Sequence, residues 1–150
     1  MARHVHLAVE RTGAITPGAL DGVVHLRVRG VTVLDWRRVR LDAAALALAR
    51  AAAADHVAGG EAPLFGGADM TVTHRGNDVT VSDLRGCDAP RGASFTVPWA
   101  AFAGAVLRLG NEAVRRGGAD SPLRAELRAL LKPIRARHRA LVRRPRSTHP

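Results

Sequence analysis

The sequence of this 150-residue chain contains no tyrosine, one cysteine and one lysine, and aromatic residues make up only 3% of it. The single cysteine, Cys87, cannot form a disulfide within the chain, which is typical of proteins of the reducing cytoplasm. No apolar run approaches the ~20 residues that cross a bilayer, and the N-terminal residues lack the apolar core of a secretory signal. The sequence therefore predicts a cytoplasmic protein that is neither secreted nor inserted in a membrane.

The positive charge is unevenly distributed along the chain. The formal net charge is +10, and almost all of it comes from arginine because Lys132 is the only lysine. From Arg108 to the end there are 12 basic and three acidic residues, whereas the first 107 residues carry 11 basic and 10 acidic ones. The excess charge thus belongs to the C-terminal third, although an arginine bias can also reflect a GC-rich genome.

Two segments of the chain resemble each other. Residues 24–36 and 71–84 each contain an alternating strand pattern, an Arg-Gly turn and a Val-Thr-Val-x-Asp strand, and a helical pattern follows each. Gly30, in the first of these turns, can adopt a positive φ. The pattern predicts a duplicated strand-turn-strand-helix unit.

The duplication predicts an α+β fold. One domain would cover residues 1–118, with copies at about 1–58 and 69–118 joined by a glycine-rich linker. We expect an antiparallel sheet of about five strands, drawn from both copies, with the two helices packed on one face. A basic amphipathic helix (119–146) and a disordered tail (147–150) complete the chain.

Two helices are predicted within the duplicated domain. Asp42 is a good N-cap for an alanine-rich helix from Ala43 to about His56. Thr96 is a plausible N-cap for the second helix, with Pro98 in its first turn. The buried stripe of that second helix repeats with the helical period and comprises Trp99, Phe102, Val106 and Leu109.

A third helix is predicted to begin at Ser121 and Pro122. Pro133 lies inside it and is expected to kink the helix or split it in two. An apolar stripe runs along this helix and comprises Leu123, Leu127, Leu130, Ile134 and Leu141. The stripe requires a partner surface, which is either the body of the same chain or a second copy of the helix.

The basic residues of this last segment are the strongest candidates for a binding site. They lie largely off the apolar stripe and comprise Arg124, Arg128, Lys132, Arg135, Arg139, Arg143 and Arg144. Guanidinium groups are always charged and bind two phosphate oxygens at once, which predicts contact with nucleic acid at low sequence selectivity. The alternatives are a solvated helix without a ligand and an acidic protein partner. Scarce aromatic residues disfavour a base-stacking platform for single strands.

Other residues carry weaker signals for chemistry. His4, His6 and His25 could line one face of neighbouring strands, but no further ligand has a convincing spacing, so no metal site is predicted. Asp35 and Asp83 occupy equivalent positions in the two copies, and each is more simply explained as the residue that ends a strand and caps the next turn.

Cys87 is interpreted as an ordinary thiol, because a nucleophile needs a base held nearby. Trp36 and Trp99 are interpreted as core residues. No catalytic residue and no cofactor is predicted, so an enzyme acting on an anionic substrate is the least favoured class.

Residues 79–109 carry a family resemblance. A strand ending in Val-x-Asp, a short loop and Phe-Thr before a Trp-x-x-Phe helix resemble the C-terminal half of the BldB-like actinobacterial domain of unknown function. The matching positions are Val81, Asp83, Phe95, Thr96, Trp99 and Phe102. The resemblance implies a regulatory protein that associates with itself or with a partner, often alongside helix-turn-helix transcription factors, and it implies no catalytic residue.

These observations predict a non-enzymatic regulatory protein that contacts DNA, or a DNA-bound partner, through its arginine-rich C-terminal helix. The alternative is a protein-interaction module that forms oligomers through the apolar stripe of residues 123–141.

Overall fold

The computed structural model describes residues 5–11, 21–28, 31–54, 56–58, 69–85, 94–116 and 122–143. Within these ranges the chain forms an α+β fold of two antiparallel sheets and three helices. The predicted fold class is therefore confirmed, but the strands form two hydrogen-bonded sheets and not a single sheet of about five strands.

The first sheet has three strands in the order β1-β2-β3. Its strands are β1 (Val5–Arg11), β2 (Asp21–Val28) and β3 (Val31–Arg40). The β2–β3 ladder shifts its register twice, between Gly22 and Val24 and between Leu26 and Arg27. Alternation along β2 buries Leu26 and Val28 and exposes Arg27, so one face of this sheet contributes to the core.

The second sheet has four strands in the order β4-β5-β6-β7. They are β4 (His56–Ala58), β5 (Asp69–Arg75), β6 (Asp78–Arg85) and β7 (Phe95–Pro98). The turn between β5 and β6 contains Gly76 at a φ of 60°, a conformation that glycine adopts without the steric cost of a Cβ atom. The predicted Gly30 turn lies outside the described residues.

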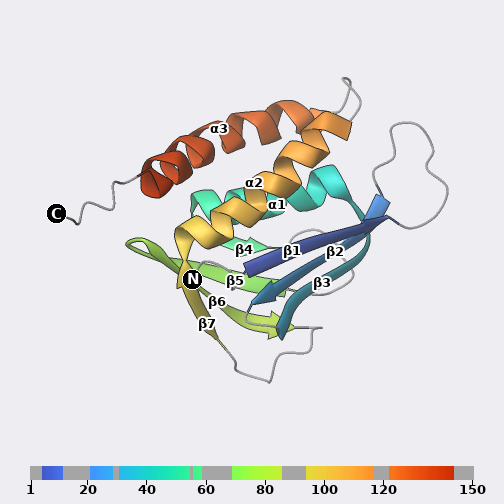
Figure 1. Cartoon of the computed structure of the whole chain (residues 1–150). Coiled ribbons are helices and arrows are strands. Elements are labelled where there is room, and N and C mark those ends of the chain that lie inside the picture. The colour runs from blue at the N-terminus through green and yellow to red at the C-terminus, as the bar shows by residue number, and fades with distance from the viewer. Residues whose placement is uncertain are drawn as a thin grey trace.

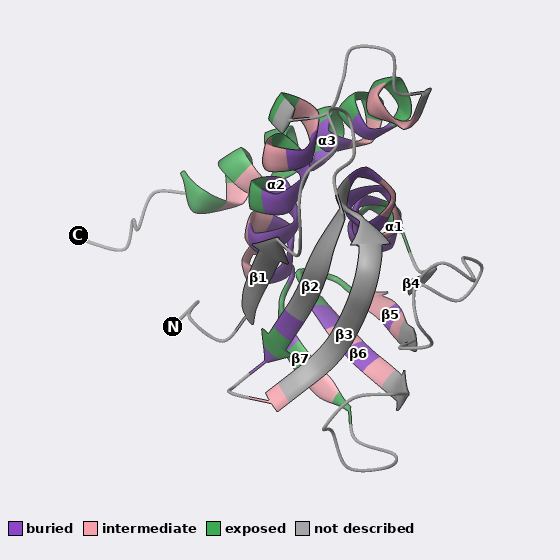
Figure 2. Ribbon diagram, turned by 90° about the vertical axis from the view of Figure 1, so that its right-hand side faces the viewer, coloured by how far each residue is buried: buried purple, intermediate pink, exposed green. Residues whose placement is uncertain are grey.

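The helices form two layers above the strands (Figure 1). Helices α1 (Leu41–Ala53) and α2 (Trp99–Arg116) pack against each other and contact strands of both sheets. Helix α3 (Pro122–Val142) packs on α1 and α2 and forms the outermost layer. Figure 2 shows that the buried residues of α3 face the other two helices, whereas its opposite side is exposed.

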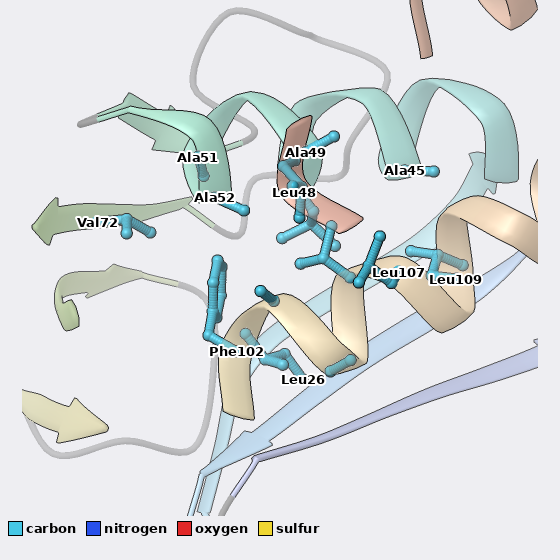
Figure 3. Close-up of a cluster of buried hydrophobic side chains, with 14 of the residues drawn as sticks. Leu26, Ala45, Leu48, Ala49, Ala51, Ala52, Val72, Phe102, Leu107 and Leu109 are labelled. Carbon is cyan, nitrogen blue, oxygen red and sulfur yellow. The ribbon is translucent and has the colours of Figure 1, made fainter. Parts of the chain in front are cut away.

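The core lies between the sheets and the first helix layer (Figure 3). The predicted stripe of α2 is confirmed, since Trp99, Phe102, Val106 and Leu109 are all buried. Most alanines of α1 are buried as well, and their small side chains allow the two helices to approach closely. The indole Nε1 of Trp99 donates a hydrogen bond of 2.8 Å to the carbonyl oxygen of Ala52 in α1, so the one polar atom of this large side chain is satisfied inside the core.

The start of α2 differs from the prediction. Thr96 is not a helix cap, because residues 95–98 form the edge strand β7 and the helix begins at Trp99. The hydroxyl of Thr96 bonds the hydroxyl of Thr80 across the β6–β7 ladder at 2.9 Å. Pro98 is tolerated there because an edge strand does not need every N–H group. The backbone N–H of Trp99 bonds the carbonyl oxygen of Asn77 at 2.7 Å, which fixes the helix start to the β5–β6 turn.

The other helices differ from the prediction in smaller ways. Helix α1 ends at Ala53, and His56 instead begins β4. Asp42 lies in the first turn of α1 and accepts a hydrogen bond from the N–H of Ala43 at 2.8 Å. Helix α3 continues through Pro133, an exposed residue, and is not split in two. Among the described helices, none is long and apolar enough to cross a membrane.

Candidate nucleic-acid interface

The apolar face of α3 packs on the body of the same chain. Leu127, Leu131 and Ile134 are at most 2% exposed, and Leu123, Leu130 and Leu141 are partly buried against the same core. Of the two partner surfaces that the sequence left open, the structure therefore uses the chain's own α1 and α2. Leu131 was not among the predicted stripe residues, although it lies four residues after Leu127 and three before Ile134 and so shares their helix face.

Two glycines of α2 allow α3 to approach closely. A Cβ atom added at Gly110 would lie 2.7 Å from Cδ2 and 2.8 Å from Cδ1 of Leu131. A Cβ atom added at Gly104 would lie 3.2 Å from Nε2 of His138. The two contacts run in opposite directions along the helices, so α2 and α3 form an antiparallel pair. This packing determines which side of α3 faces outward.

A row of cations runs along an exposed flank of α3 beside α2 and ends at Arg143, one residue past the helix. Its members recur at intervals of three and four residues, are all exposed, and comprise Arg128, Lys132, Arg135, Arg139 and Arg143. We call this row the basic stripe. Because residues at this spacing lie one above the other on a helix, the stripe runs along the helix beside the face that packs on α2.

A groove of about 600 Å³ lies along the seam between α2 and α3. Its cationic wall is part of the basic stripe and comprises Arg128, Lys132 and Arg135. Leu131 and Val114 also line the groove. Across the seam, Nη2 of Arg135 donates a hydrogen bond of 2.7 Å to Oδ1 of Asn111. This bond restrains a guanidinium group that is otherwise on an exposed, flexible side chain.

Two predicted binding residues do not belong to the basic stripe. Arg124 is half-buried, and its Nε atom is buried without a hydrogen-bond partner. Arg144 lies outside the described residues. The structure thus brings together five of the seven predicted cations in one exposed row.

Arg137 has a different position from the basic stripe. Its guanidinium carbon lies 4.0 Å from the centre of the Trp99 ring, and its Nη2 donates a hydrogen bond of 3.1 Å to the carbonyl oxygen of Gly76. The side chain therefore connects α3 with the start of α2 and with the β5–β6 turn through a cation–π contact and a charged hydrogen bond. In the sequence, Arg137 occupies the place between Ile134 and Leu141 where the stripe would have its next apolar residue.

The acidic residue of α3 pairs with a different helix. Glu126 forms an ion pair with Arg50 of α1, and the two side chains are 47% and 43% exposed. An ion pair at this exposure contributes ~0–1 kcal/mol to stability. Because Glu126 pairs with Arg50 of α1, its carboxylate does not neutralise a cation of the basic stripe.

The weaker candidates are not assembled into a site. The strand register pairs His6 with Arg27 and His25 with Ala8, whereas His4 and Cys87 lie outside the described residues. Where residues are described, no group of three or more His, Cys, Asp or Glu could hold a metal ion. His74, one potential base, bonds the carbonyl oxygen of Ala51 through Nε2 at 2.8 Å.

Asp35 and Asp83, which occupy equivalent positions in the two copies, do not lie at strand ends as predicted. Strand β3 continues from Asp35 to Arg40, and β6 continues from Asp83 to Arg85. Neither aspartate therefore ends its strand.

Comparison with known proteins gives no family for the chain. No family model matches it, and neither a curated protein nor a solved structure does. Function must therefore be inferred from the surface itself.

Proposed function

We propose that this chain is a non-enzymatic regulatory protein that binds duplex DNA, with little sequence selectivity, through the basic stripe of α3. The observation that supports the proposal is the exposed row of five cations along one side of a helix. Arginine retains its charge at any physiological pH and can donate two hydrogen bonds to one phosphate. Contacts of this kind position a duplex without reading its bases.

The packing of α3 on the body of the chain supports the same proposal. The helix is anchored by its buried leucines, by Arg137 and by the bond between Arg135 and Asn111. A row of charges on a packed helix loses less side-chain and backbone entropy on binding than the same charges on a free segment. The regulatory role itself rests on the family resemblance of residues 79–109.

The oligomerisation alternative has less support. Leu127 and Ile134 are no more than 2% exposed within one copy of the chain, so a second copy could contact them only if α3 left α1 and α2. The three half-buried leucines of the same face offer a smaller surface.

Anisotropy of a short fluorescent duplex of mixed sequence tests the proposal. Deleting α3 would expose the apolar surface of α1 and α2 on which it packs, so substitutions are the better perturbation. The Arg128→Ala/Lys132→Ala/Arg135→Ala variant should bind at least about tenfold more weakly at ~100 mM salt. Each phosphate contact favours binding by releasing about 0.9 counterions from the DNA, and the variant lacks three such contacts.

A control separates a local surface from general charge. Arg27 and Arg75 are exposed and lie on strands, so the Arg27→Ala/Arg75→Ala variant should retain nearly the affinity of the unaltered chain. Absence of duplex binding, or equal weakening by both variants, refutes the proposal.

We also propose that the two sheets and helices α1 and α2 descend from one duplicated unit. Each hairpin, β2–β3 and β5–β6, precedes a helix of the inner layer. Superposition of the two units tests this, since residues 31–35 should coincide with residues 79–83 when α1 is placed on α2. A cytoplasmic location remains a proposal that fractionation of the producing cells can test.

A further inference from the structure

Helix α2 carries cations beside the same seam. Arg108 and Arg115 are exposed and share a side of α2 with Asn111, since these residues are three and four apart. A second depression, of about 310 Å³, is lined by Arg108, Asn111, Glu112 and Arg115. Asn111 also lines the larger groove, so the two depressions adjoin at this residue.

Asn111 joins the two helices at the point where their cations converge. Its Oδ1 accepts the bond from Arg135 of α3. The other amide atom, Nδ2, carries two donor hydrogens, which cannot bond a guanidinium. A carboxylate at this position would neutralise Arg135, whereas the neutral amide orients it and leaves its charge uncompensated. The seam therefore presents a positioned guanidinium and an amide donor, with further cations on each side.

We propose that α2 and α3 form one phosphate-binding surface, in which Arg108 and Arg115 are a second row beside the basic stripe and Asn111 positions Arg135 between them. The inference rests on the proposed function and adds residues that the sequence did not assign. Its ligand is the sugar–phosphate backbone of duplex DNA.

The dimensions of the two rows agree with this ligand. Arg108 and Arg115 are separated by about 10 Å along α2, and Arg128 and Arg135 by about the same distance along α3, at ~1.5 Å per residue. Packed helix axes lie ~8–10 Å apart. Since each strand of a duplex carries one phosphate per ~3.4 Å of helix axis, a duplex lying along the seam presents about three phosphates over the ~10 Å that each row spans.

The lining favours a duplex over a single strand. Among the described residues that line the two depressions, none is aromatic, and single strands are bound largely by stacking of bases on aromatic rings. Trp99 and Phe102 are buried in the core and are not available for stacking.

Glu112 provides a test of whether the surface binds a negatively charged ligand. It is the acidic residue of the smaller depression, and its charge opposes an approaching phosphate. If the surface binds a polyanion, Glu112→Gln must tighten binding, whereas removal of the neighbouring arginines must weaken it. A purely structural role of this helix face would not produce opposite effects.

The experiment measures duplex affinity against salt for four variants of the full chain, each checked for an unchanged thermal midpoint. Arg108→Ala/Arg115→Ala should weaken binding about tenfold or more and reduce the slope of log K against log salt by about 1.8, at ~0.9 per contact. Arg108→Lys/Arg115→Lys should retain the slope, because the charges remain. Glu112→Gln should increase the affinity, and Asn111→Ala should decrease it with little change in slope.

The outcomes distinguish this inference from the proposed function. The charge-matched Arg27→Ala/Arg75→Ala variant should bind as the unaltered chain does. If α3 substitutions weaken binding but Arg108→Ala/Arg115→Ala does not, or if Glu112→Gln does not tighten it, the second row is refuted and the basic stripe stands. If neither set matters, the proposed function fails too. Equal affinity for polyglutamate or for a single strand would overturn the assignment to duplex DNA.

Discussion

The packing of α3 on α2 can be tested with two glycine substitutions on the same helix. Gly104→Ala and Gly110→Ala each remove the helix-propensity penalty of glycine, about 1 kcal/mol. At Gly104 the added methyl meets the imidazole of His138 at 3.2 Å, and this half-buried ring can shift by a few tenths of an ångström. We expect Gly104→Ala to be neutral or to stabilise the protein by up to about 1 kcal/mol.

At Gly110 the same methyl group meets a packed side chain. It would lie 2.7 and 2.8 Å from the two Cδ atoms of Leu131, which is only 1% exposed and has no open space to enter. Overpacking of this kind costs about 1–3 kcal/mol. The free energy of unfolding of Gly110→Ala should therefore be about 1–3 kcal/mol lower than that of Gly104→Ala, since the propensity gain is common to both.

Urea denaturation of both variants measures this difference at an unchanged m-value. Leu131→Ala should cost about 2–5 kcal/mol by itself, and in that background Gly110→Ala should stabilise by about 1 kcal/mol, because the clash is gone. Equal stabilisation by the two glycine substitutions would refute the contact between Gly110 and Leu131.

Substitutions at three further positions test the contacts that hold α3 and the core. Arg137→Ala should lower the free energy of unfolding by about 1–2 kcal/mol through loss of the contact with Trp99, and Arg137→Lys should not restore it fully in urea titrations. Trp99→Phe should cost about 1–3 kcal/mol, because the buried carbonyl oxygen of Ala52 loses its donor; a thermal midpoint equal to that of the unaltered chain would contradict this. Glu126→Gln should change stability by less than about 0.5 kcal/mol, since its ion pair with Arg50 is exposed, and calorimetry would detect a larger effect.

The long periodic segments of the fold could be predicted from the sequence. Alternation identified the strands of both hairpins, and the helical period identified Phe102, Val106 and Leu109 as buried. The short strands β4 and β7, of three and four residues, could not be predicted because so few residues define no period. Thr96 before Pro98 is typical of a helix start, but pairing with Thr80 across the sheet prevailed over this local preference.

The site could be predicted only where it depends on one helix. The spacing of Arg128, Lys132 and Arg135 specifies a single side of α3 whatever the helix packs against. In contrast, the contact of Arg137 with the Trp99 ring and the hydrogen bond from Arg135 to Asn111 join segments far apart in the chain. Such contacts have no local sequence signal and depend on the angle at which α3 crosses α2.

The salt dependence of duplex binding by the full chain tests the central claim most directly. If each of the five cations of the basic stripe neutralises one phosphate, log K should fall with log salt at a slope of about −4.5 between about 50 and 200 mM salt, and of about −6.3 if Arg108 and Arg115 add two contacts. The affinity should also be nearly independent of DNA sequence. A slope near zero, or no measurable binding at the lower salt concentration, would contradict the account.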